Sequence, residues 1–281
     1  MYPRKWSWPK GEKLALSVGL AFEDFENESQ YKTNVPFGKK NHFSLSFGDY
    51  GWKAGVWRLM ETLGRYSIKS NVSTNGRAAE RHPEVCAALV KAGHELNGHG
   101  WVNDVLAGDD NPETELAEIQ RCTKALTDAS GGIKPVGWTS PGSTGSKHTL
   151  SFLKGEGYIW NGDDASDDLP FLRDTDRGPM VIMPRTNTLH NDLSMWLGPK
   201  NPPSIIWDGF KASFDQLYAE GKAGRPAWTE ITLHCHIAGR PTLQATIRQC
   251  LEYAKQHEGV WFARRSDIAR WALEREGKKA G

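Results

Sequence analysis

Five acidic or imidazole side chains stand where apolar segments of this chain end: Glu23, Asp24, His99, His234 and His236. A carboxylate can take a proton from water or bind a cation. An imidazole can give a proton to a departing nitrogen, because its pKa lies near neutrality. Together these residue types predict acid–base hydrolysis of a bond to nitrogen, with His234 as the proton donor.

The spacing of these side chains indicates which of them share a face. Alternate residues of a strand point to the same side, so His234 and His236 face one way and Cys235 faces the other. Glu23 and Asp24 are neighbours, so one of them points toward the interior and the other toward a loop or helix. The sequence leaves open which of the two is the base.

Apolar runs alternate with helical patterns along the whole chain. The expected strands are 14–22, 67–74, 94–98, 135–138, 158–162, 180–184, 229–233 and 260–263. The expected helices are 56–63, 78–92, 113–129, 147–154, 210–219, 243–256 and 266–274, with a polar loop from the first strand to about residue 51. This alternation predicts an α/β fold in which parallel strands joined by right-handed crossovers close a barrel.

The carboxyl ends of parallel barrel strands lie on one face, where the loops that follow them form the active site. Six further side chains at these ends are expected to contact the substrate: Trp101, Asn103, Trp138, Ser140, Pro141 and Asp163. His236 is expected to contact it as well. Trp101, Trp138 and Trp52 would provide flat walls suited to a small planar ring.

Length and composition favour one domain. The 281 residues are 38% hydrophobic, which suits a single barrel over 1–281 with extensions at 1–13 and 275–281. The formal net charge is +1, so neither nucleic acid nor a membrane surface is an expected partner.

The absence of a secretory pattern or a membrane-spanning run, together with four scattered cysteines, predicts a cytoplasmic protein. A small molecule is the expected substrate, and segment 25–48 is expected to act as a lid or as the contact of a homo-oligomer.

Several segments, spread over nearly the whole chain, carry a family resemblance. They include Leu20-Ala-Phe-Glu-Asp24, Gly98-His-Gly-Trp101, Gly137-Trp-Thr-Ser-Pro-Gly142, Leu233-His234 and Gly259-Val-Trp-Phe-Ala263. In this order they resemble the polysaccharide deacetylase superfamily, and more closely its allantoinase-like and cyclic-imide-hydrolase-like branch. The resemblance implies a distorted seven-stranded (β/α) barrel of the carbohydrate esterase family 4 type that hydrolyses an amide.

The resemblance also bears on a metal cofactor. Metal-dependent members have a first motif like Thr-Phe-Asp-Asp-Gly, whose second Asp binds the metal, and a second motif His-x-x-x-His. Here these places are held by Glu23-Asp24 and by His99 with Asn103. Asp24, His99 and Asn103 are thus the implied ligands of one Zn²⁺, although asparagine is a poor zinc ligand beside imidazole. Allantoinase-like relatives alter the same triad, which implies a weakened metal site or none. No organic cofactor is expected.

These inferences converge on a hydrolase of non-peptide carbon–nitrogen bonds. A water held by Glu23 or Asp24 and any bound cation attacks the carbonyl, Asn103 or the cation stabilises the oxyanion, and His234 protonates the nitrogen. A small cyclic amide, imide or ureide is the expected substrate. The alternatives are a metal-dependent N-acetyl-sugar deacetylase and a non-catalytic ligand-binding barrel.

Overall fold

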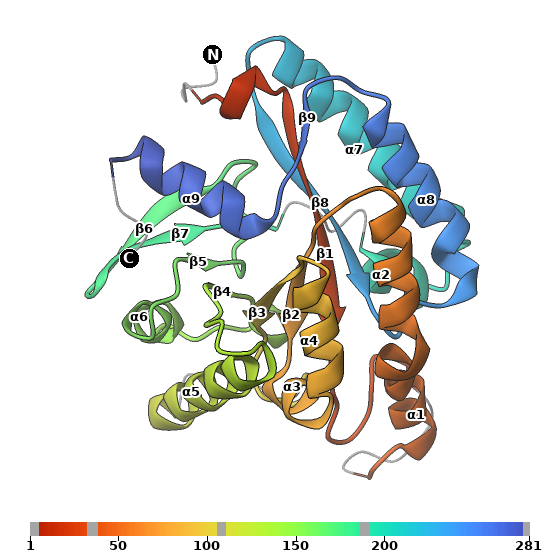
Figure 1. Ribbon diagram of the computed structural model, residues 1–281, viewed down its shortest axis with the longest axis vertical. Coiled ribbons are helices and arrows are strands. Elements are labelled where there is room, and N and C mark those ends of the chain that lie inside the picture. Colours follow the sequence, from red (N-terminus) through yellow and green to blue (C-terminus); the bar gives the residue numbers. More distant parts are fainter. Residues whose placement is uncertain (1–5, 33–38, 106–110, 186–190, 278–281) are drawn as a thin grey trace.

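A single curled sheet of nine strands organises the protein (Figure 1). The computed structural model describes residues 6–32, 39–105, 111–185 and 191–277, so parts of both expected extensions and of segment 25–48 lie outside the described residues. The strands are β1 Leu14–Phe22, β2 Asn71–Thr74, β3 Glu95–Gly98, β4 Gly137–Trp138, β5 Trp160–Asn161, β6 Phe171–Thr175, β7 Gly178–Ile182, β8 Ala227–His234 and β9 Val260–Phe262. They pair in the order β6-β7-β5-β4-β3-β2-β1-β8, and β9 pairs with β1.

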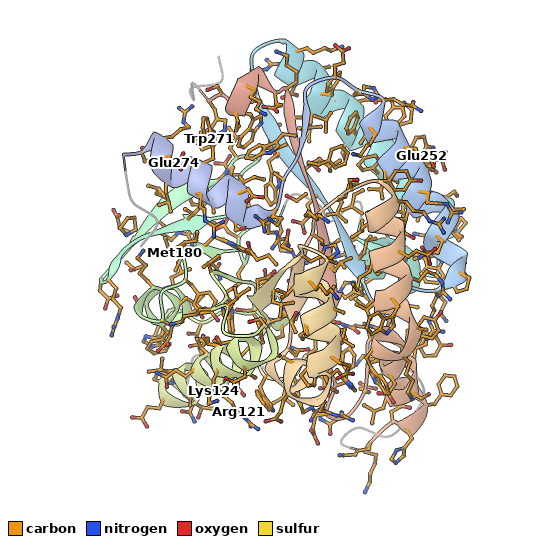
Figure 2. The ribbon with its side chains drawn as sticks, viewed as in Figure 1. Arg121, Lys124, Met180, Glu252, Trp271 and Glu274 are labelled. Carbon is orange, nitrogen blue, oxygen red and sulfur yellow. The ribbon has the colours of Figure 1, made fainter. Side chains whose placement is uncertain are left out.

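Most helices lie around the convex side of this sheet, whereas the last one packs on the opposite face against Ala15, Trp160 and Trp228 (Figure 1). The helices are α1 His42–Tyr50, α2 Val56–Arg65, α3 Gly76–Arg81, α4 Pro83–Lys91, α5 Pro112–Ala129, α6 Thr149–Gly155, α7 Ser204–Lys222, α8 Pro241–Lys255 and α9 Arg265–Arg275, with a π-helical turn at Gly51–Gly55 between α1 and α2. Many of their charged side chains point outward, as Arg121 and Lys124 of α5 and Glu252 of α8 do in Figure 2. Among the described helices, none is long and apolar enough to cross a membrane.

Strand β1 has one face toward the apolar core beneath the outer helices and the other face toward the inside of the barrel. All nine of its residues are buried. Leu16, Val18 and Leu20 join the apolar core that also includes residues of α2, α7 and α8. The residues between them are small or polar, such as Ser17 and Gly19, and share the opposite face of the strand. Glu23 continues this second series just beyond the strand.

Every described strand pairing except β6–β7 is parallel. The strand carboxyl ends therefore meet at one rim, as the alternation of strands and helices predicted. Beyond β7 the chain returns to the sheet at Asn191, which forms an isolated parallel bridge to Thr232 of β8. This bridge links the segment after β7 to β8 near the other end of the strand order. The expected α/β barrel class is confirmed.

Local details differ from the sequence-based expectation. Residues 78–92 form two helices, because Pro83 has no N–H to continue the first one and starts the second. The expected loop before residue 51 contains α1, which Asn41 caps by accepting a hydrogen bond from the Ser44 amide. Strand β6 was not expected, because its exposed, charged segment lacks an apolar pattern.

A buried ion pair crosses the barrel interior below the rim. Both carboxylate oxygens of Glu230 accept hydrogen bonds from Arg265, with distances of 2.5 and 2.6 Å. Arg265 also donates to the Thr139 hydroxyl at 3.0 Å. A Cβ atom at Gly19 would lie 2.4 Å from Glu230 Oε1, so this glycine leaves room for the pair.

The π-helical turn that leads into α2 approaches the loop after β8 at its last residue, Gly55. A Cβ atom at Gly55 would lie 1.9 Å from the backbone oxygen of Cys235, and backbone cannot turn aside as a side chain can. Gly55→Ala should therefore push α2 away from the loop after β8 and lower the free energy of unfolding by about 1–3 kcal/mol. Urea denaturation measures this loss.

Gly64→Ala, near the other end of α2, is the matched control. Gly64 is exposed, and a Cβ atom there would meet nothing within 4 Å. Alanine is the better helix former, so this variant should gain about 0.5–1 kcal/mol. Equal stability of the two variants would refute the role of the close approach at Gly55.

Candidate active site

Glu23 lies at the centre of a buried cluster at the carboxyl end of β1. Its side chain is only 2% exposed. Its Oε1 atom lies 3.3 Å from His99 Nε2 and 3.7 Å from His234 Nε2, and its Oε2 atom lies 4.0 Å from His236 Nδ1. Histidines from the ends of β3 and β8 thus surround a carboxylate at the end of β1, as expected if the strand ends share one rim.

His234 is held by a carboxylate that the sequence analysis did not single out. Its Nδ1 atom lies 2.6 Å from Oδ1 of Asp192, whose Oδ2 accepts the backbone N–H groups of His234 at 2.8 Å and Ala238 at 3.0 Å. Asp192 is fully buried. Since a carboxylate only accepts, Nδ1 of His234 carries a proton and Nε2 faces Glu23.

The other two imidazoles are oriented by acceptors as well. His99 Nδ1 donates to the backbone oxygen of Thr139 at 2.5 Å. His236 Nε2 donates to Gln30 Oε1 at 2.7 Å, while Gln30 Nε2 donates to Glu23 Oε2 at 2.8 Å. These partners orient both rings and turn His99 Nε2 and His236 Nδ1 toward Glu23.

The cluster separates the charge states of its members. Burial by itself would raise the pKa of Glu23, but the charge of His234 and the hydrogen bond from His99 lower it to about 2. Burial would lower the pKa of His234, whereas the charges of Asp192 and Glu23 raise it to about 9. Burial lowers the pKa of His236 to about 3. At neutral pH Glu23 is therefore a carboxylate, His234 an imidazolium and His236 a neutral imidazole.

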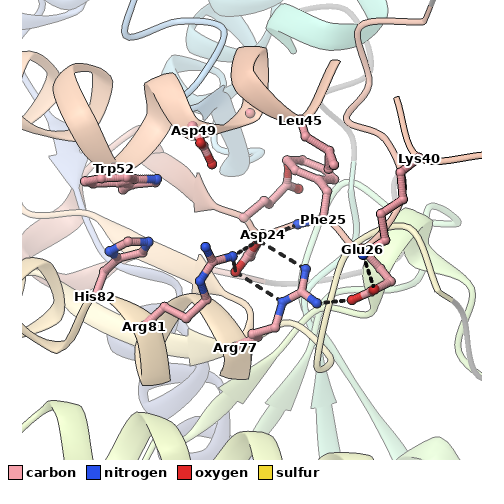
Figure 3. A pocket seen from close by; sticks show the side chains of 12 residues that line it. Asp24, Phe25, Glu26, Lys40, Leu45, Asp49, Trp52, Arg77, Arg81 and His82 are labelled. Atoms are coloured by element: carbon pink, nitrogen blue, oxygen red, sulfur yellow. Dashed lines mark hydrogen bonds and ion pairs between the residues drawn. The ribbon is translucent and has the colours of Figure 1, made fainter. Parts of the chain in front are cut away.

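Asp24 points away from this cluster, into a separate ionic network. Its Oδ2 atom lies 3.2 Å from Arg77 Nε and 3.1 Å from Arg81 Nη1. Arg77 also pairs with Glu26, as Figure 3 shows. The two neighbouring acids thus face different surroundings, which answers the question of which one lies among the histidines.

An open cleft of about 430 Å³ adjoins Glu23 and this network. Its wall includes Trp52, whose ring stacks on His82 with a centroid distance of 4.3 Å and an interplanar angle of 18° (Figure 3). Arg81, at its edge, has a side chain that is 51% exposed. The cleft combines one flat wall with charged groups of both signs.

The metal ligands implied by the motifs do not fit a divalent ion in this arrangement. The Asp24 carboxylate is already paired with two guanidinium groups, whose charge opposes a cation. Asn103 donates its backbone N–H to the backbone oxygen of Asp24, and its buried Oδ1 atom has no described partner. In the described ranges, no three His, Cys, Asp or Glu side chains are placed to hold a metal.

The remaining expected residues fall into two places. Asp163 accepts hydrogen bonds from the backbone N–H and the hydroxyl of Ser140, both at 2.7 Å. The Ser140 hydroxyl in turn accepts from Trp138 Nε1 at 3.0 Å, and Pro141 follows in the same turn. Trp101 lies away from the Glu23 cluster and packs against α5. The Cζ atom of Arg121 lies 3.3 Å from the centroid of its ring.

Asp192, Gln30 and Arg77 were missed because their role depends on contacts across the fold. Asp192 lies 42 residues from His234, and Gln30 lies 206 residues from His236. Neither belongs to a motif with a recognisable spacing. The only available signal was indirect, namely that a buried proton-donating histidine needs an acceptor on its second nitrogen.

Comparisons with known proteins agree with this geometry. The polysaccharide deacetylase family model matches residues 38–159. A putative polysaccharide deacetylase of Schizosaccharomyces pombe is 27% identical, and the match covers 95% of this chain and 92% of that protein.

Two crystal structures are similar over almost their full length. A probable polysaccharide deacetylase from Pseudomonas aeruginosa PAO1 is 30% identical with a TM-score of 0.84, covering 96% of this chain and 93% of that one. PuuE allantoinase is also 30% identical with a TM-score of 0.84, covering 96% and 97%. The chain therefore belongs to the polysaccharide deacetylase superfamily and is an amidohydrolase of non-peptide carbon–nitrogen bonds.

Proposed function

We propose that the protein opens the ring of a small cyclic amide, imide or ureide. The observation that carries this proposal is the opposed pair of Glu23 and His234, a carboxylate and an imidazolium 3.7 Å apart in a buried site. Amide hydrolysis needs a group that takes a proton from water and a group that gives one to nitrogen. The pair supplies both at neutral pH.

Glu23 is the general base of this proposal. It takes a proton from water, and the resulting hydroxide forms a bond to the carbonyl carbon. A carboxylate with a pKa near 2 is a weak base on its own. The transfer becomes favourable because the water becomes more acidic as its oxygen forms the bond to the carbonyl carbon.

His234 is the general acid. Its Nε2 proton moves to the amide nitrogen as the carbon–nitrogen bond breaks, which lets the nitrogen leave as an amine. Asp192 keeps the imidazole oriented and stabilises its charge before the transfer. After ring opening, the proton held by Glu23 returns to His234 or to solvent, which restores the starting charges.

The size of the cleft supports a small ring. Its volume of about 430 Å³ falls in the range of small-molecule sites, roughly 300–1,000 Å³. Trp52 and the His82 ring stacked on it form an aromatic side of the cleft, and planar rings gain from aromatic contacts. One of the similar structures, PuuE allantoinase, is named for its action on allantoin, which is a cyclic ureide. A small-molecule partner, a cytoplasmic location and a homo-oligomer remain predictions.

A second candidate is an N-acetyl-sugar deacetylase that uses a divalent metal. It is favoured by the open, polar edge of the cleft, where the side chains of Lys40 and Arg81 are 56% and 51% exposed. Such an edge suits the hydroxyl groups of a sugar. The S. pombe relative is named as a putative polysaccharide deacetylase.

Removing either member of the acid–base pair should stop turnover. We expect Glu23→Gln and His234→Gln each to lower kcat by about 10²–10⁴, because each removes one proton transfer. Steady-state kinetics on a cyclic imide measures the loss. Glu252→Gln, on the outer face of α8, is the matched control and should keep full activity. Wild-type kcat in either cluster variant would contradict the assignment.

The pH dependence of kcat/KM should have its alkaline limb near pH 9. His234 donates only while protonated, so activity is lost as the pH rises through its raised pKa of about 9. The acid limb, which reports protonation of Glu23, should lie near pH 2. Asp192→Asn removes a charge that raises the His234 pKa, so the alkaline limb should move to lower pH. If the alkaline limb of Asp192→Asn stays at the wild-type pH, His234 is not the group whose deprotonation abolishes activity.

A substrate panel with and without EDTA distinguishes the two candidate functions. We expect cyclic imides and hydantoins to be opened at the same rate after chelation, because Asp24 is committed to Arg77 and Arg81. N-acetylated chito-oligomers should release no acetate. Acetate release that EDTA abolishes and zinc restores would instead establish the metal-dependent deacetylase.

A further inference from the structure

The side-chain amide of Gln30 lies inside the Glu23 cluster. Its nitrogen is 2.8 Å from Glu23 Oε2, and its oxygen is 2.7 Å from His236 Nε2. One O=C–N unit therefore connects the proposed base to a neighbouring imidazole. The substrate of an amidohydrolase presents the same unit.

The backbone around Gln30 is anchored independently of the cluster. The Asp104 carboxylate accepts the backbone N–H groups of residues 26–28. Ser29 donates its N–H to the Ser44 hydroxyl of α1 at 2.8 Å, and Tyr31 stacks on Phe47 with a centroid distance of 4.6 Å. Only the side chain of Gln30 enters the cluster, so rotation about its own bonds is enough to leave it.

The two partners of this amide match the needs of the reaction. In a tetrahedral intermediate, one carbon carries the oxygen that came from water and the oxyanion. The amide nitrogen of Gln30 stands where Glu23 would hold the attacking water, and its oxygen stands where a donor would stabilise the oxyanion. That donor is His236 Nε2, and His234 Nε2 faces the opposite oxygen of Glu23.

His236 is suited to this task by its surroundings. Phe25 and Phe47 contact its ring edge-on, with centroid distances of 5.3 and 6.0 Å. The charged groups that face it are Glu23, His234 and Arg240, and burial outweighs them in keeping the ring neutral. A neutral imidazole donates a hydrogen bond without giving up its proton, as an oxyanion donor must.

We propose that Gln30 marks the place of the reacting amide: His236 Nε2–H binds the carbonyl oxygen and stabilises the oxyanion, and the substrate enters by displacing the Gln30 side chain. This rests on the proposed amide hydrolysis. In the balanced step, water gives a proton to Glu23 and its oxygen bonds to the carbonyl carbon. The carbonyl electron pair moves to the oxygen held by His236 and returns when the carbon–nitrogen bond breaks, as His234 protonates the nitrogen.

Binding of acetamide tests the occupied subsite without requiring turnover. Calorimetry should show that Gln30→Ala binds acetamide about tenfold more tightly than the wild type, because a competing internal group no longer lowers the competent fraction. Gln30→Asn is one methylene too short to reach both partners and should behave in the same way. Gln216→Ala, on the exposed face of α7, should bind as the wild type does. Equal affinity in all variants would overturn the proposal.

Kinetics on the cyclic substrate separates this role from a structural one. Gln30→Ala should lower KM and keep kcat, whereas a residue that merely positions Glu23 would lower kcat. His236→Ala should lower kcat by about 10²–10³ with little change in KM, and His236→Gln, which restores an N–H donor, should recover part of that loss. Unchanged kcat in His236→Ala would refute the oxyanion role. Absence of turnover in the wild type, with the acetamide result intact, would refute only the proposed function.

Discussion

The site depends on burying one negative charge, that of Glu23, at the carboxyl end of β1. A carboxylate buried in this way is costly unless charge and hydrogen bonds compensate it. The imidazolium of His234 supplies the charge, and Asp192 makes that cation tolerable in the same dry region. The three groups form a row of alternating sign, so the two outer acids stabilise the proton on the central imidazole. Removing one member leaves a buried charge without its partner.

The scaffold provides the space in which this row can exist. The interior face of β1 carries small or polar residues such as Ser17 and Gly19, so the barrel has room for the Glu230–Arg265 pair. The same alternation, continued one residue past the strand, turns Glu23 inward. Packing of the outer core against the helices and placement of the site are therefore two consequences of one period-two pattern.

Glu23 and Asp24 show why a motif position does not define a role. The two acids are adjacent, yet one contacts three histidines and the other contacts Arg77 and Arg81. The two guanidinium groups compensate the charge of Asp24, and their own positive charge opposes a metal ion there. Asp24, Arg77 and Arg81 all line the cleft beside the histidine cluster.

The sequence by itself determined the barrel class, the shared rim and the presence of Glu23, His99, His234 and His236 there, because strand periodicity is local and parallel strands align their ends. It also predicted most elements, but it missed α1 and β6 and the break at Pro83, where capping, edge pairing and a missing N–H outweigh the apolar pattern. Only the tertiary structure decided that Asp192 orients His234, that Gln30 enters the cluster and that Asp24 belongs to the arginines. Those contacts join residues tens to hundreds of positions apart, and no short-range pattern encodes such distances.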